Sequence, residues 1–160
     1  MIRARIASLL GVLCSTLFAI SLLIADGHLG YLLFLWCICG ALFISSLGLW
    51  YRKRLAQVAF ILVASLTLLL YIPEIALAPG GCAGTMAGCY NHYIQSSPML
   101  AVAHYFVYIT CSHEPDLCCS QELIRCHKLS MYVQPALTLF AIMILLKPLT
   151  SNNRLSEREK

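Results

Sequence analysis

Charged residues are scarce in this sequence. Only 11% of its 160 residues are Asp, Glu, Lys or Arg, and 60% are hydrophobic. Soluble domains usually carry about 25% charged residues. A soluble domain of this length could not bury so much apolar surface, so we exclude that class and expect lipid to be the solvent for much of the chain.

Several motifs of known chemistry are also missing. The sequence has no Gly-rich phosphate-binding loop, no His-Glu-x-x-His, no Gly-x-Ser-x-Gly and no Asn-x-Ser/Thr acceptor. The net charge of +4 comes from basic residues that flank apolar windows, so it does not indicate nucleic-acid binding. We therefore predict no cofactor and no nucleic-acid partner, and no motif identifies an enzyme.

Long uncharged windows are what the sequence does have. A helix needs roughly 20 apolar residues to cross the hydrocarbon core, and a backbone in lipid must satisfy its own hydrogen bonds. The first window is longer than the apolar part of a usual signal peptide, so we interpret it as an uncleaved span. The sequence predicts an all-α integral membrane protein with one domain (1–160), whose four helices run up-down-up-down at about 6–25, 29–50, 55–72 and 129–146.

The basic residues predict the orientation of these spans. Cytoplasmic segments are enriched in Lys and Arg. With four spans, only Arg125 and Lys128 lie on the side of the long connection, 73–128. Both termini are therefore expected in the cytoplasm, and 73–128 is expected to form an extracytoplasmic cap, in a bacterial inner membrane or a eukaryotic secretory or plasma membrane. The basic residues on the cytoplasmic side are Arg3, Arg5, Arg52, Lys53, Arg54, Lys147, Arg154, Arg158 and Lys160.

The cap is predicted to contain a short helix. Pro73 and Pro79 are expected to end the third helix, and Ser97 followed by Pro98 is typical of a helix start. The segment 99–110 is too short to cross a membrane, which favours an interfacial or re-entrant helix. Helical spacing places His104, Tyr105 and Tyr108 on one face. The face expected toward lipid or the bundle holds Met99, Val102, Ala103, Phe106 and Ile109.

Cysteines are concentrated in this cap. An even number of cysteines on the oxidising side predicts structural disulfides, because a small cap has little core of its own. A local ring between Cys82 and Cys89 is the first pairing we expect. Cys111 and Cys126 are the nearest partners for the adjacent pair Cys118 and Cys119. The six disulfide candidates are Cys82, Cys89, Cys111, Cys118, Cys119 and Cys126.

Two other uses of these cysteines stay open. Four spans with a cysteine-bearing loop between the last two resemble the quinone-linked oxidoreductases of the DsbB type, which would imply a membrane thiol-disulfide oxidoreductase. That family carries Cys-x-x-Cys in span two, where this chain has Cys37 and Cys39, so no catalytic residue is transferred. The other use is a zinc or copper site, since Cys and His are common ligands of both metals. Its candidate ligands are Cys111, His113, Cys118, Cys126 and His127.

A cluster of ionisable residues is expected at the outer interface. Asp26 and His28 lie between the first two spans, and Glu74 lies at the end of the third. Ionisable groups at membrane depth are functional candidates by default. Since the spans carry few polar groups, we expect an accessory or scaffold subunit of a larger membrane complex. Its partners would be the lipid bilayer, other membrane subunits and an extracytoplasmic protein that contacts the stapled cap.

Overall fold

A computed structural model describes residues 2–51, 54–77, 86–114 and 121–156, and every regular element in this part of the chain is helical. Four helices are long and apolar enough to cross a membrane, which confirms the predicted number of spans. They are α1 (Ile2–Ile24), α2 (Leu29–Trp50), α3 (Arg54–Leu77) and α7 (Gln121–Ser156).

Two helix ends differ from the prediction. The predicted end at Pro73 is wrong, because Pro73 lies inside α3, which continues to Leu77. The last span was predicted at about 129–146, with a short helical stretch at 120–128 leading into it, and the structure joins the two in one helix, since α7 begins at Gln121 and includes Lys128. Proline removes one backbone hydrogen bond, but membrane helices tolerate this where neighbouring groups satisfy the freed carbonyl. A basic residue near a helix end can extend its long side chain toward the interface, so Lys128 does not end the helix.

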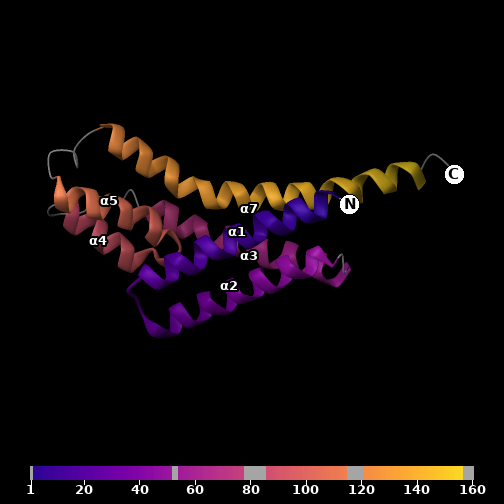
Figure 1. The fold of residues 1–160 in the computed structure, drawn as a ribbon, viewed down its shortest axis with the longest axis horizontal. Coiled ribbons are helices and arrows are strands. Elements are labelled where there is room, and N and C mark those ends of the chain that lie inside the picture. Colours follow the sequence, from indigo (N-terminus) through magenta and orange to yellow (C-terminus); the bar gives the residue numbers. More distant parts are fainter. Residues whose placement is uncertain (1, 52–53, 78–85, 115–120, 157–160) are drawn as a thin grey trace.

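The chain ends and the cap lie at opposite ends of the bundle. In Figure 1 the start of α1 and the last turns of α7 lie at the right, and the α1–α2 connection lies toward the left with the cap. At the end of the bundle where the two termini lie, the Arg5 guanidinium is 5.3 Å from the centre of the Trp50 ring. This arrangement is the one expected for an even number of spans joined by two tight turns and one long connection.

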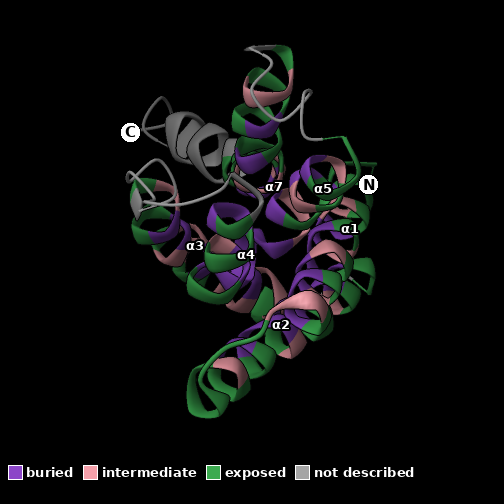
Figure 2. Cartoon of the chain, turned by 90° about the vertical axis from the view of Figure 1, so that its left-hand side faces the viewer, coloured by how far each residue is buried: buried purple, intermediate pink, exposed green. Residues whose placement is uncertain are grey.

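Small residues bring α1 and α2 close together. Ser8 Oγ donates a hydrogen bond to the carbonyl of Ser46 at 2.6 Å, and Cys39 Sγ donates to the carbonyl of Ser15 at 3.3 Å. Gly11 lies in the same seam, where an added Cβ would meet Ser46 Oγ and would lie 2.6 Å from Phe60 Cε2. Lipid tails are as apolar as the helix surfaces, so no hydrophobic driving force brings membrane helices together. They associate instead through close packing of this kind. Figure 2 shows the buried faces of the helices turned toward one another and exposed faces turned outward.

The cap is a helical hairpin. It consists of α4 (Met86–Ser96), the short 3-10 helix η1 (Pro98–Leu100) and α5 (Ala101–His113). The predicted helix start is confirmed, since Ser97 precedes η1 and Pro98 occupies its first turn. No helix was predicted at the position of α4. The expected ring at Cys82 and the adjacent pair Cys118 and Cys119 lie outside the described residues.

Candidate functional site

The tip of the cap hairpin inserts into the end of the bundle opposite the chain ends. Met99 is fully buried, and Leu100 is 3% exposed. Both residues belong to a hydrophobic cluster formed by all four long helices, whose other buried members are Phe18, Leu22, Leu35, Ile38, Cys39, Tyr71 and Met131. The tip therefore completes the core of the bundle at this end and does not merely cover it.

The Glu74 side chain holds this tip in place by hydrogen bonding. Its carboxylate is 4% exposed and accepts a hydrogen bond from the Met99 backbone N–H at 3.0 Å through Oε2. The Tyr31 hydroxyl donates to the other oxygen, Oε1, at 3.3 Å. A single carboxylate thus connects α2, α3 and the hairpin tip. An acceptor with two such donors is compatible with burial, whereas an isolated buried carboxylate would not be.

The surroundings of Glu74 differ from those of the two residues expected beside it. Asp26 and His28 are exposed on the α1–α2 connection, whereas Glu74 is buried beneath the tip. Its hydrogen-bond partners, Tyr31 and Met99, come from other segments. The structure therefore gives Glu74 a different environment from Asp26 and His28, and a shared site for the three groups stays a prediction. Long-range contacts of this kind leave no local pattern in a sequence.

A pair of histidines joins the hairpin to α7. His104 Nδ1 and His127 Nε2 are 2.9 Å apart, and the two residues are 0% and 6% exposed. Tyrosines surround them: the Tyr93 ring centre lies 5.5 Å from that of His104, and the Tyr90 ring centre lies 5.0 Å from that of His127. A hydrogen bond between two neutral imidazoles needs an N–H on one ring and an unprotonated nitrogen on the other. The contact therefore suits two neutral rings, one of which donates to the other.

Burial controls the protonation of this pair. Burial, assisted by His127, lowers the pKa of His104 to about 3. Burial also raises the pKa of Tyr90, helped by the neighbouring Tyr93, so both phenol and imidazole are held neutral. The pair therefore behaves as an uncharged structural contact at neutral pH.

Acidification is expected to weaken the attachment of the hairpin. Because the pKa of His104 is lower in the folded protein than in the unfolded chain, the unfolded chain binds the proton more readily. The stabilisation is therefore complete above the ordinary pKa of 6.5 and is lost as pH falls toward 3. At about 1.4 kcal/mol per pH unit, the loss reaches about 2 kcal/mol by pH 5.

Thermal unfolding in detergent between pH 8 and pH 5 measures this effect. The pH dependence should be smaller in His104→Gln and unchanged in His113→Gln, since His113 is exposed. Equal pH dependence in the natural protein and in His104→Gln would contradict the assignment.

The buried face of α5 includes a residue whose burial was not predicted. His104, Val107 and Cys111 are buried, whereas Phe106 is 68% exposed. The prediction grouped His104 with Tyr105 and Tyr108 and gave the face with Phe106 as the one toward lipid or the bundle; the exposed Phe106 fits the lipid alternative. The burial of His104 was not predicted: His127 provides a partner for its Nδ1, whereas its Nε2 has none in the described part of the chain. The i, i+3, i+7 spacing of 104, 107 and 111 was the pattern that could have indicated this face.

The described cysteines fall into two groups. Cys89 and Cys111 are buried and disulfide-bonded. Cys126 instead carries a free, exposed thiol. Cys82, Cys118 and Cys119 lie outside the described residues, so the predicted pairing of the six cysteines stays a prediction.

The expected metal ligands do not gather around one point. His113 is exposed at the end of α5, and His127 is hydrogen-bonded to His104. Cys118 lies outside the described residues. Within 2–51, 54–77, 86–114 and 121–156, no group of three or more His, Cys, Asp or Glu side chains is arranged to hold a metal ion.

Cys37 and Cys39, within α2, are not placed as a redox-active pair. Cys37 is exposed, whereas Cys39 is buried and donates to the carbonyl of Ser15. Residues two apart on a helix point in nearly opposite directions, so these two thiols cannot readily bridge. Cys14 is likewise free and buried.

Comparisons of the chain with protein-family models, with curated proteins and with solved structures give no match. The candidate site is therefore interpreted from its own geometry: a cap hairpin held to a membrane-type helix bundle by Glu74 and by the His104–His127 pair.

Proposed function

We propose that this protein is an accessory or scaffold subunit of a larger membrane complex, with its cap contacting an extracytoplasmic partner. One observation carries the proposal. The cap hairpin is attached to the bundle at its tip by Glu74 and at its side by His127. The surface that it presents is therefore fixed before any partner arrives, which reduces the conformational entropy lost on binding.

The outward face of α5 supports a role in recognition. Tyr105, Phe106 and Ile109 are 40%, 68% and 39% exposed on the side opposite the buried His104. Aromatic side chains are enriched in the centres of protein interfaces, where they often carry most of the binding energy. A strip of this kind on an immobilised helix suits a subunit contact.

The proposal includes an oxidising environment for the cap. The disulfide-bonded state of Cys89 and Cys111 is in keeping with it, as is the excess of basic residues near the chain ends. On this proposal both termini are cytoplasmic, the cap is extracytoplasmic, and disulfides staple the cap. Thiol-disulfide exchange is the second candidate, and the free thiol of Cys126 is the observation that favours it.

Replacing Phe106 by aspartate is expected to dissociate the complex without unfolding the cap. Truncating or charging an aromatic interface residue typically costs about 2 kcal/mol or more of binding energy, so co-purification under gentle extraction should fall by at least about tenfold. The melting temperature should change little, because most of the Phe106 side chain is exposed. Quantitative mass spectrometry of the gently extracted complex measures the partner.

Tyr51→Asp is the matched control. Tyr51 is 75% exposed but follows α2 at the end of the bundle opposite the cap, so its replacement should leave co-purification unchanged. A chain that stays a lone monomer under gentle extraction would refute the subunit proposal, as would equal losses in the two variants.

A further inference from the structure

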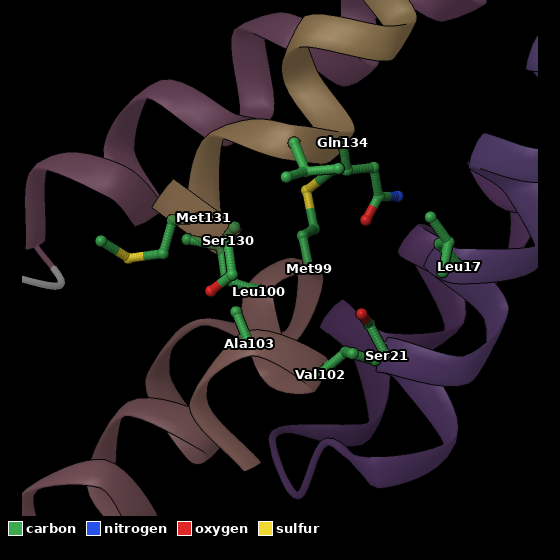
Figure 3. Close-up of a pocket in the computed structure, with 10 residues that line it drawn as sticks. Leu17, Ser21, Met99, Leu100, Val102, Ala103, Ser130, Met131 and Gln134 are labelled. Atoms are coloured by element: carbon green, nitrogen blue, oxygen red, sulfur yellow. The ribbon is translucent and has the colours of Figure 1, made fainter. Parts of the chain in front are cut away.

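A hollow seam separates α5 from α7. Two cavities, of about 210 Å³ and about 330 Å³, lie along it and share three lining residues, Val102, Ala103 and Ser130. Figure 3 shows the first cavity, with Met99 and Ala103 on the cap side and Leu17 and Ser21 of α1 on another side. Because the cavities share a wall, they form one elongated groove, which we call the α5–α7 groove.

The α5–α7 groove has the character of a hydrocarbon site. Val102, Phe106 and Leu123 line its outer part, and Leu17 and Met131 line its inner part. Along α7 it extends from residue 123 to residue 134, which is about 16 Å at 1.5 Å per residue. That length is about half of the roughly 30 Å hydrocarbon core and therefore matches one leaflet. Concave apolar sites of this kind bind ligands through a few well-placed polar groups.

One polar group in the groove has an unused donor. Ser21 is 1% exposed, and its hydroxyl makes no hydrogen bond to the described residues. In Figure 3 this hydroxyl points into the cavity, toward the space between Met99 and Gln134. Ser130 Oγ, also on this wall, donates its one hydrogen to the carbonyl of His127, and Gln134 Nε2 uses one of its two N–H donors on the carbonyl of Cys14. A buried hydroxyl without a partner is unfavourable, and a ligand acceptor would satisfy it.

The depth of Ser21 indicates which acceptor it meets. Ser21 lies one helical turn before the end of α1 at Ile24, at the cap end of the bundle. In a bilayer this depth is close to the boundary between hydrocarbon and headgroups, where the ester carbonyls of phospholipids lie. A carbonyl oxygen is an acceptor, so it complements the hydroxyl.

We propose that the α5–α7 groove binds one acyl chain of a phospholipid from the leaflet on the cap side, with the ester carbonyl accepting a hydrogen bond from Ser21. The hydrocarbon lies against Val102, Ala103 and Met131. The bound lipid fills the seam between the hairpin and α7 and so belongs to the folded structure. Phe106 belongs both to the rim of this groove and to the proposed partner surface, so the lipid site is tested through Ser21 and Ala103, which are not part of that surface.

Photocrosslinking in nanodiscs tests the lipid site. The probe is a phosphatidylcholine with a diazirine on one acyl chain, and peptide mass spectrometry identifies the labelled residues. We expect labels to concentrate on 99–106 and 123–134. Ser21→Ala should lower labelling there by about fivefold, the effect of one lost neutral hydrogen bond. A probe of the same chain length with an ether in place of the ester should show no dependence on Ser21.

Two tryptophan variants complete the test. Ala103→Trp fills the groove and should abolish the local labelling, whereas Leu62→Trp on the exposed face of α3 should leave it unchanged. Thermal unfolding of each variant reports whether it is folded. If Ala103→Trp does not fold, the Ser21→Ala comparison with the two probes still decides the question. Even labelling over all exposed helix faces, or labelling that does not respond to Ser21→Ala, would overturn the proposal.

Discussion

Replacing Glu74 by alanine is expected to release the tip of the cap hairpin from the bundle. The change removes the acceptor of the buried Met99 N–H and of the hydroxyl of Tyr31, a residue that is 39% exposed. A buried donor left unpaired costs about 1–3 kcal/mol, so the free energy of unfolding should fall by about that amount. Unfolding by titration with a denaturing detergent measures this loss, and hydrogen exchange at the Met99 amide reports the release of the tip directly.

Two further variants separate the hydrogen bonds from other effects of the substitution. Glu74→Gln keeps an acceptor oxygen and should lose less stability than Glu74→Ala. Glu122→Gln changes an exposed carboxylate on α7 and should have no measurable effect. If the Met99 amide stays protected from exchange in Glu74→Ala, then Glu74 does not hold the tip.

Replacing Gly11 by valine is expected to separate α1 from its neighbours. Even one Cβ at this position would meet Ser46 Oγ and lie 2.6 Å from Phe60 Cε2, so α2 and α3 would both have to move. Such movement would also strain the adjacent hydrogen bond from Ser8 to the carbonyl of Ser46. Overpacking of this kind typically costs about 1–3 kcal/mol, and we expect the upper part of that range. Detergent titration and thermal unfolding measure the change.

Gly40→Val provides a closely matched control. It is the same substitution within a spanning helix, but a Cβ at Gly40 would have no neighbouring atom within 4 Å. Gly40 is half-buried, but because the added side chain meets no neighbour, its effect on stability should stay within about 0.5 kcal/mol. Similar losses at the two glycines would show that the seam is not tightly packed and would contradict the description of α1 and α2.

The spans could be predicted from the sequence because their cause is local. A long uncharged apolar window has one stable form in lipid, and the four windows correspond to α1, α2, α3 and α7. The exact ends were less predictable, as Pro73 and Lys128 show. Proline and lysine are both unfavourable in a membrane-spanning helix. Even so, neighbouring groups can satisfy the carbonyl that a proline frees, and a lysine near the helix end can extend its side chain to the interface.

The site was less predictable because its contacts are long-range. Glu74 was correctly selected as an unusual ionisable residue, but its donors lie 43 residues before it and 25 residues after it in the chain. His104 was grouped with Tyr105 and Tyr108 by helical spacing, and spacing alone does not indicate that its side chain is buried. Its burial depends on His127, 23 residues away, and no local pattern connects the two.

The order of these contacts along the chain has a consequence for biogenesis. A ribosome makes the chain from its N-terminus, and earlier segments fold first. Glu74 and Tyr31 are already present when Met99 is synthesised, so the tip can attach while α7 is still unmade. The contact between His104 and His127 must wait for α7. The hairpin therefore forms a template on the partly assembled bundle, and the arrival of the last helix completes the protein from that side.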